Sequence, residues 1–243
     1  MLSIFIKEVN GIFSSLIGYM VIGLFLLLMG LMLWVFPDYS ILNYNYASLQ
    51  QLFDIAPIIF LFLIPAITMR SFAEETQSGT IELLATRPLS DWAIIFGKFF
   101  AGLLLVAFSL LPTLLYFYTI SNLGSPAGNI DGGAVGGSYI GLFLLAAVFV
   151  AIGIFSSSLT DNQIVAFVFS VFLCFVFYWG FTFISNLPVF VGTSDTFVLK
   201  LGVENHYYSL SRGLIDTRDL IYFFSIIGLF IYLTQVSLDR RKW

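Results

Sequence analysis

Few residues of this chain could do chemistry. The sequence contains one histidine, His206, and one cysteine, Cys174, which can form no internal disulfide. Nucleophilic catalysis needs a base beside the nucleophile and a metal site needs several ligands, and neither set can be placed within the apolar stretches. No Gly-x-x-x-x-Gly-Lys-Ser/Thr run occurs, so the chain has no P-loop of its own for ATP. We expect no catalytic residue, metal site or cofactor on this chain, and interpret Cys174 as a small core side chain.

The charged residues that could bind a partner are concentrated in one stretch, residues 69–98. This stretch, MRSFAEETQSGTIELLATRPLSDWAIIFGK, holds three of the ten basic and four of the fourteen acidic residues. Only 10% of the whole chain is charged. The stretch therefore resembles water-soluble protein, and it lies between two strongly apolar segments.

Six apolar runs position this charged stretch. With 59% hydrophobic residues and a mean hydropathy of +0.99, the chain is predicted to be an all-α integral membrane protein. Runs of roughly 20 continuously apolar residues span a bilayer as helices and do not alternate as barrel strands do. The second run contains Pro57 and Pro65, and is either kinked or begins before Asp54. The runs are residues 18–36, 55–69, 99–120, 139–155, 164–184 and 220–238.

Two features of these runs bear on function. Within the boundaries just given they contain no Asp, Glu, Lys, Arg or His, which argues against a proton-coupled or ion-coupled carrier. Six spans place both termini on one side, where seven basic residues fall against three on the other, so the positive-inside rule predicts cytoplasmic termini. The three exceptions are Lys200, Arg212 and Arg218. No basic tract suggests nucleic-acid binding.

Outside the spans we expect short elements and no second domain, so that residues 1–243 form one transmembrane domain. Residues 1–17 show helical apolar spacing with Lys7, Glu8 and Asn10 on the other face, which predicts an amphipathic helix at the cytoplasmic interface. The glycine-rich residues 122–138 are predicted to form a flexible external loop. Thr160 or Asp161 is expected to cap the fifth spanning helix.

The charged stretch has its own helical pattern, and we name residues 70–98 the coupling segment. Phe72, Ala73 and Thr76 share one helical face, whereas Glu74 and Glu75 are expected to extend from the other. Gly79 ends this first helix.

A second, shorter helix is predicted after Gly79. Thr80 can cap it, and Ile81, Leu83 and Leu84 give it an apolar surface beside Glu82. Arg87-Pro88 stops it because a residue before proline disfavours helical geometry, and Ser90 with Asp91 begins the third span. Such a helix can dock in the groove of a partner, or float on lipid headgroups.

The order of residues in this segment has a known parallel. Glu74-Glu75, Gly79-Thr80, Glu82, Leu83-Leu84, Arg87-Pro88 and Ser90 follow one another with a spacing that resembles the cytoplasmic coupling helix of ABC-2-type exporter permeases. Further stretches, among them LTDNQIVAF, HYYSLSRGLIDTRDLIYF and SLDRRKW, resemble the permeases associated with gliding motility in Bacteroidota. The resemblance implies an ABC-2-type permease fold, a separate cytoplasmic ABC ATPase that binds ATP and Mg, and a second permease-like subunit or a second copy of this chain.

The external residues 186–218 are predicted to form short helices at the outer interface, with tyrosines at headgroup level. In ABC-2-type permeases the corresponding region forms re-entrant helices, so His206, Tyr207, Tyr208 and Arg212 are candidates for an outer gate or partner contact. A purely structural interfacial helix is the alternative.

The function expected from this reasoning is that of a permease subunit of an ATP-driven transporter in the bacterial inner membrane, associated with gliding motility. It is not itself an enzyme, because ATP hydrolysis would reside in the partner subunit. Two alternatives remain: a non-transporting membrane scaffold of the motility machinery, and a channel or secondary carrier that works without an ATPase.

Overall fold

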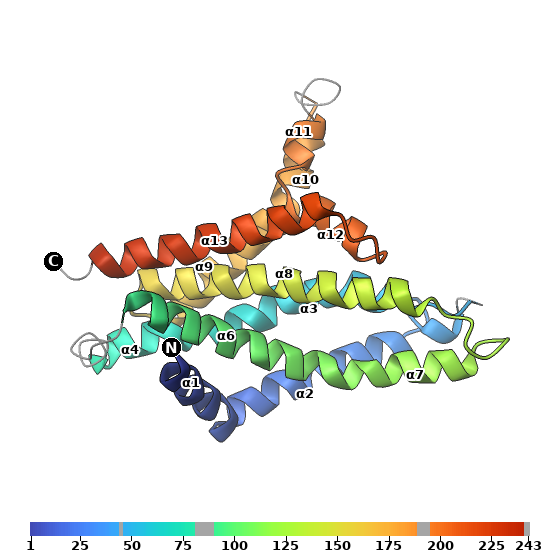
Figure 1. Cartoon of the computed structure of the whole chain (residues 1–243), viewed down its shortest axis with the longest axis horizontal. Coiled ribbons are helices and arrows are strands. Elements are labelled where there is room, and N and C mark those ends of the chain that lie inside the picture. The colour runs from blue at the N-terminus through green and yellow to red at the C-terminus, as the bar shows by residue number, and fades with distance from the viewer. Residues whose placement is uncertain (44–45, 81–89, 189–194, 241–243) are drawn as a thin grey trace.

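The computed structural model describes residues 1–43, 46–80, 90–188 and 195–240, and in these ranges the chain is helical without a strand. Six helical segments are long and apolar enough to cross a membrane, which confirms the predicted number (Figure 1). These spans are Leu16–Val35, Gln50–Gln77, Asp91–Leu123, Gly132–Leu159, Gln163–Ser185 and Thr217–Arg240.

Several spans are built from consecutive helices of different type, which Figure 1 labels in part. The elements are α1 (Leu2–Ser14), α2 (Leu16–Gly30), π-helical η1 (Leu31–Val35), the 3-10 turn η2 (Ile41–Asn43), α3 (Gln50–Thr68), α4 (Arg70–Gln77), α6 (Asp91–Leu110), the 3-10 turn η3 (Leu111–Thr113), α7 (Leu114–Leu123), α8 (Gly132–Leu159), α9 (Gln163–Phe175), π-helical η4 (Val176–Gly180), α10 (Phe181–Ser185), α11 (Asp195–Leu199), α12 (Val203–Leu210) and α13 (Thr217–Arg240).

Helix α8 is the centre of the bundle. It packs against α3, α6, α9 and α13, and 83% of its apolar window is buried, compared with 22% for the span that begins with α9. A helix that is apolar on all sides is expected at such a position. Small residues let its neighbours approach: at Gly153 an added Cβ would lie 2.7 Å from Thr68 Cβ of α3.

The helix starts differ from two sequence expectations because polar side chains cap the helices. The carboxylate of Asp131 accepts hydrogen bonds from the backbone N–H groups of Gly133 (2.9 Å) and Ala134 (3.1 Å), so α8 begins at Gly132. The prediction of a flexible loop over residues 122–138 was therefore wrong for its second half. Asn162 caps α9 through a 2.9 Å bond from Ile164 N–H, so the predicted cap at Thr160 or Asp161 was also wrong.

The second span is longer than its apolar core. Helix α3 begins at Gln50 and includes Asp54, which accepts a 2.9 Å hydrogen bond from the Gln50 side chain. Pro57 and Pro65 both lie inside α3. The helix is interrupted at Met69, and α4 continues the span to Gln77. This extension past Asp54 is one of the two alternatives that the sequence left open.

The expected N-terminal helix is present as α1. Ser15, in an extended backbone conformation, separates it from α2, so the chain turns there before it enters the first span. Helix α1 packs on α6, where Ile4 is buried against Gly97. Its depth relative to a bilayer stays a prediction.

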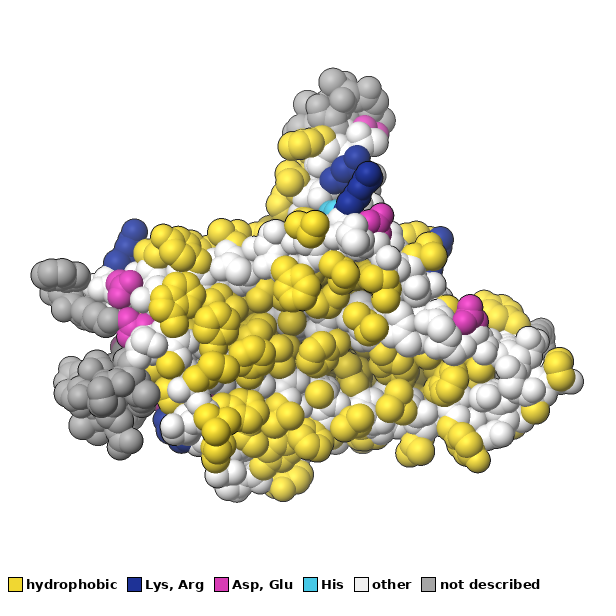
Figure 2. Space-filling model, in the orientation of Figure 1, with side chains coloured by type: hydrophobic (Ala, Val, Ile, Leu, Met, Phe, Trp, Pro, Cys, Tyr) yellow, Lys and Arg dark blue, Asp and Glu magenta, His cyan; other side chains and the backbone are white. Residues whose placement is uncertain are grey.

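Both termini lie at the same end of the bundle as α4, as an even number of spans requires (Figure 1). Helices α10 and α11 pack against each other and project sideways from the bundle. Hydrophobic side chains cover the middle of the face in Figure 2, and charged side chains lie toward its ends and along the projecting part. This distribution is the one that a bilayer demands, and the cytoplasmic placement of the termini remains a prediction.

We predict that Gly153→Ala destabilises the protein, because its methyl group would push α3 away from α8. Overpacking of this kind costs about 1–3 kcal/mol, and about 2–4 °C of melting temperature accompanies each kcal/mol in a chain of this size. Thermal unfolding of the purified protein measures the effect. Gly136→Ala in the same helix is the control, since no atom lies within 4 Å of its added Cβ. Equal melting temperatures for the two variants would contradict the close packing of α3 on α8.

Candidate functional site

The coupling segment begins with helix α4 and ends within helix α6, at the same end of the bundle as the N-terminus. We call these two helices its first and second limbs. The first limb, α4, ends at Gln77, and Gly79 follows with a φ of 68°, a left-handed conformation that favours glycine and breaks the helix as predicted. Thr80 donates a 3.3 Å hydrogen bond to the carbonyl of Glu75. The second limb, α6, begins at Asp91, and Ser90 caps it as predicted by accepting from Ala93 N–H.

Part of the predicted docking helix lies outside the described residues, which omit 81–89. The roles proposed for these residues remain predictions. They are Ile81, Glu82, Leu83, Leu84, Arg87 and Pro88.

The two limbs meet at a buried lysine. Lys98 of α6 has a side chain that is only 2% exposed, and its ammonium lies 3.0 Å from Glu75 Oε2 of α4 and 3.0 Å from Glu8 Oε1 of α1. It also donates a 2.6 Å hydrogen bond to the Ser71 carbonyl. The ring of Phe72 lies 5.0 Å from the ammonium. A buried ammonium needs such partners, because an unpaired buried charge is strongly unfavourable.

A second lysine completes this cluster. Lys7 of α1 lies 2.8 Å from Glu75 Oε1 and 3.5 Å from Glu8 Oε1, and more than half of its side chain is exposed. Burial alone would lower the pKa of Lys7, but its hydrogen bond to Glu75 and the charges of Glu75 and Glu8 raise it above the usual value. We call Lys7, Glu8, Glu75 and Lys98 the Lys98 junction. It ties α1, α4 and α6 together.

The two glutamates of α4 face in different directions. Glu74 remains on the exposed side, where it receives bonds of 2.7 and 2.8 Å from the guanidinium of Arg70. Glu75 points inward to the Lys98 junction, so the expectation that both glutamates extend from the outer face was wrong for Glu75. Helical spacing alone could not reveal this, because the partners of Glu75 come from α1 and α6.

The break between α3 and α4 is closed by a serine of α8. The hydroxyl of Ser157, which is fully buried, accepts hydrogen bonds from the backbone N–H groups of Phe72 (2.9 Å) and Ala73 (3.0 Å). It donates to the carbonyl of Met69 at 2.9 Å. One side chain thus satisfies three backbone groups that the interrupted helix leaves open, and it fixes α4 to the central helix.

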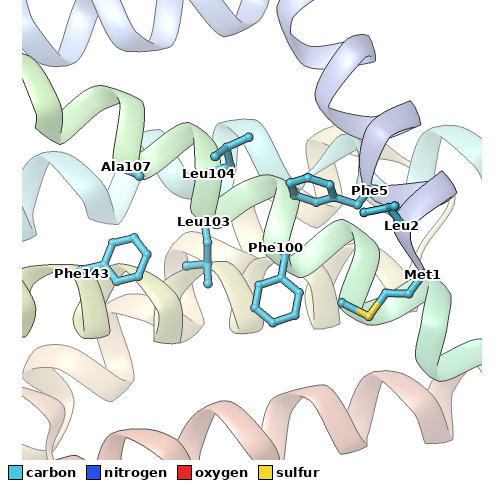
Figure 3. A pocket seen from close by; sticks show the side chains of 8 residues that line it. All are labelled: Met1, Leu2, Phe5, Phe100, Leu103, Leu104, Ala107 and Phe143. Carbon is cyan, nitrogen blue, oxygen red and sulfur yellow. The ribbon is translucent and has the colours of Figure 1, made fainter.

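Two hollows flank α1. A cleft of about 1010 Å³ lies between α1, α2, the α3–α4 span and α6, and the Lys98 junction forms part of its wall. An apolar groove of about 670 Å³ lies between α1, α6 and α8, with Met1, Leu2 and Phe5 on one side. Figure 3 shows Phe100, Leu103, Leu104 and Ala107 of α6 and Phe143 of α8 along the rest of this groove.

At the opposite end, the four outer-gate candidates divide into two pairs. Tyr207 of α12 is buried and donates a 2.6 Å hydrogen bond to the Phe53 carbonyl of α3, while His206 Nδ1 lies 2.7 Å from Asp219 Oδ1 of α13. These two side chains hold α12 to the bundle. Tyr208 is exposed, and the guanidinium of Arg212 lies over its ring at 3.9 Å. A role in a gate or in partner contact remains a prediction for all four residues.

The described residues contain no group of three His, Cys, Asp or Glu side chains that could hold a metal ion. The contacts within the Lys98 junction are ion pairs and hydrogen bonds. Its place between the two limbs of the coupling segment suits mechanical connection.

Six apolar spans, with α8 buried among them and a charged junction at one end, define a multi-pass membrane protein. The sequence matches the model of the family described as ABC-2 family transporter protein over residues 2–194. The match spans most of the chain, and the chain belongs to this family. None of the curated proteins compared with the chain matches it.

Sequence reasoning missed Glu8, Lys98 and Ser157 as residues that organise this site. Glu8 was assigned to the polar face of the N-terminal amphipathic helix and Lys98 to the end of the coupling segment, and nothing in their local pattern pairs them across 90 residues. A weak signal existed for Ser157, because Ser156, Ser157 and Ser158 form a polar run at the end of an otherwise apolar span.

We predict that Lys98→Met strongly destabilises the protein, because it removes the buried cation that Glu8 and Glu75 share and leaves them only the mostly exposed Lys7. Removing one partner of a buried ion pair costs about 3–5 kcal/mol. The loss is measured as a lower melting temperature of the purified protein. Lys7→Met, which removes a mostly exposed cation, should cost about 1 kcal/mol or less.

A triple variant provides the decisive control for this prediction. Adding Glu8→Gln and Glu75→Gln to Lys98→Met removes the two carboxylates that have lost Lys98 and should restore much of the lost stability. If the triple variant were less stable than Lys98→Met alone, the junction would not act through charge pairing.

At the outer end, Tyr207→Phe should lower stability by about 0.5–1.5 kcal/mol, the usual net value of one hydrogen bond. The reason is that the Phe53 carbonyl loses its tyrosine donor within the packed contact between α12 and α3. Tyr208→Phe is the matched control, since Tyr208 is exposed and should leave the melting temperature nearly unchanged. The reverse order of effects would show that α12 is not held through Tyr207.

Proposed function

We propose that this chain is the permease subunit of an ATP-driven transporter, and that a separate cytoplasmic ABC ATPase binds ATP and Mg and docks on the coupling segment. Membership of the ABC-2 family supports a transporter permease. The observation that carries the coupling proposal is the Lys98 junction, which joins both limbs of the segment to α1. ATP hydrolysis then takes place in the partner, and this chain is not an enzyme.

In the proposed mechanism, closure of the ATPase pushes on residues 71–88. The push reaches α6 and α1 through the Lys98 junction, because Glu75 lies on the limb that precedes the docking helix and Lys98 on the limb that follows it. It reaches the central helix α8 through Ser157. The predicted result is a tilt of the first, second and fifth spans. Glu74 and Glu82 are proposed as polar contacts to the ATPase, with Ile81, Leu83 and Leu84 as the apolar anchor.

Glu75 is proposed to have a role in this mechanism other than direct contact with the ATPase. Its carboxylate is engaged by Lys7 and Lys98, so contact with the ATPase would have to compete with two ion pairs. Its role in coupling is therefore proposed to be transmission of the push within the chain. Gly79 and Thr80 set the direction in which the chain leaves α4.

The permease is further proposed to assemble with a second membrane subunit in a bacterial inner membrane. A second copy of this chain, or a second permease-like subunit, would cover the faces of α2 and α9, whose spans are 28% and 22% buried. We place the complex in a bacterial inner membrane with both termini in the cytoplasm, following the distribution of basic residues. The association with gliding motility rests on sequence resemblance alone, and the transported substrate is left unassigned.

Copurification tests the docking proposal. The double change Leu83→Asp and Leu84→Asp should abolish recovery of the ATPase with this chain at native expression, since truncating a central anchor commonly costs about 2 kcal/mol or more of binding. The matched control is Leu42→Asp with Leu123→Asp, two exposed leucines, one after the end of the first span and one at the end of the third. Recovery of the ATPase with the first variant would show that residues 81–84 are not the docking site.

The same purified complex separates the alternative functions. A permease should change the ATP hydrolysis rate of its partner when added to it, whereas a passive scaffold should not. Transport by this chain alone in liposomes would favour a channel or secondary carrier over an ATP-driven permease.

A further inference from the structure

The cleft of about 1010 Å³ beside α1 has two chemically different halves. At one side its wall is aliphatic, formed mainly by Ile12 of α1, Ile67 of α3 and Leu105 of α6. The other side carries charged groups and hydroxyls. The ionisable side chains on that side are Lys7, Glu8, Arg70, Glu74, Glu75 and Lys98, and the hydroxyls include Ser71, Ser78 and Thr80.

The charges of this cleft balance. Three cations and three carboxylates line it, and each of them is paired within the chain. A ligand with a single sign of charge finds no net attraction there. The groups that remain accessible belong to both signs: the side chains of Lys7, Arg70 and Glu74 are 57%, 34% and 45% exposed. A ligand that carries a positive and a negative group can contact both.

The position of the cleft also restricts its ligand. One wall is α1, whose amphipathic sequence suits the plane of the membrane interface, and the other walls are the spanning helices α2, α3 and α6. With α1 at the interface, as predicted, the charged side would lie at the level of lipid headgroups and the aliphatic side would extend toward the hydrocarbon. A volume at the upper end of the roughly 300–1,000 Å³ usual for ligand sites leaves room for a headgroup and part of an acyl chain.

The side chains that line the cleft indicate which type of ammonium group the ligand carries. A primary ammonium has three N–H donors, and the carboxylates and hydroxyls of the cleft can accept them. A quaternary ammonium has no donor and is recognised by aromatic rings. Among the described residues that line the cleft there is no aromatic side chain. The lining therefore suits an ethanolamine headgroup better than a choline headgroup.

We propose that this cleft binds a zwitterionic phospholipid with a primary ammonium, of the phosphatidylethanolamine class. The phosphate contacts the basic side chains of Lys7 and Arg70, which come from opposite walls of the cleft, and the ammonium contacts Glu74 and the neighbouring hydroxyls. One acyl chain follows Ile12, Ile67 and Leu105. This site shares Glu74 with the proposed ATPase contact, and the other lining residues of α4 and α6 lie on the face that turns toward α1.

A cavity-filling variant tests the site without touching any charge. Gly11 of α1 lines the cleft, and no atom lies within 4 Å of a Cβ added there, so Gly11→Leu places a side chain in open space. Gly23→Leu is the matched control, since Gly23 of α2 has equally open space and does not line the cleft. Both changes replace glycine by a better helix former, so neither is expected to unfold the protein.

Lipid binding to the purified full chain is measured by native mass spectrometry with phosphatidylethanolamine, phosphatidylcholine and phosphatidylglycerol of identical acyl chains. We expect wild type and Gly23→Leu to retain phosphatidylethanolamine at least tenfold more tightly than the other two lipids. Gly11→Leu should lose this preference and bind all three alike.

Two outcomes would overturn the proposal. Equal binding of the three lipids by the wild type would mean that the cleft holds only unselected annular lipid. A preference for phosphatidylethanolamine that survives in Gly11→Leu would place the selective site elsewhere. Since the ATPase is absent from this measurement, neither result bears on the permease proposal.

Discussion

The ammonium group of Lys98 constrains the whole terminal end of this protein. A cation that is 2% exposed persists only if its partners stay within hydrogen-bonding distance, so α1 and α4 must keep their positions against α6. Glu8 and Glu75 are in turn held together by two cations, the buried Lys98 and the more exposed Lys7. The three helices thus form one unit, and the coupling segment leaves and re-enters the same unit. In the proposed mechanism, a force applied to the coupling segment would therefore reach all three helices together.

The second constraint is the need of backbone groups for partners where no water is available. The interruption at Met69 leaves N–H and carbonyl groups of the second span without intrahelical bonds, and Ser157 supplies what they lack. The same serine belongs to α8, the helix that nearly every other span contacts. The weakest point of the second span is therefore attached to the most buried part of the bundle. A helix break that is held by the hydrogen bonds of Ser157 can act as a hinge at a fixed position.

The sequence allowed the number of spans, the N-terminal helix and the break at Gly79 to be predicted, because each has a local cause in apolar run length, periodicity or backbone freedom. It misplaced the start of α8, where composition suggested a flexible loop and a single carboxylate, Asp131, capped a helix. The inward direction of Glu75 and the burial of Lys98 could not be predicted at all. Both depend on contacts between different helices, in part between residues 68 and 90 positions apart, and a pattern within one helix carries no information about them.

The spanning segments differ in length, and the difference affects how the protein fits its membrane. The first span has 20 residues, whereas the third has 33 and the fourth 28. At about 1.5 Å per residue the first span just matches a hydrocarbon layer of about 30 Å, and the third exceeds it by well over a turn. A thicker bilayer could be accommodated by α6–α7 and α8, which would draw more of their outer ends into lipid. The first span has no additional residues that could enter a thicker bilayer. A change in bilayer thickness would therefore affect mainly α2 and helix α1, to which α2 is joined.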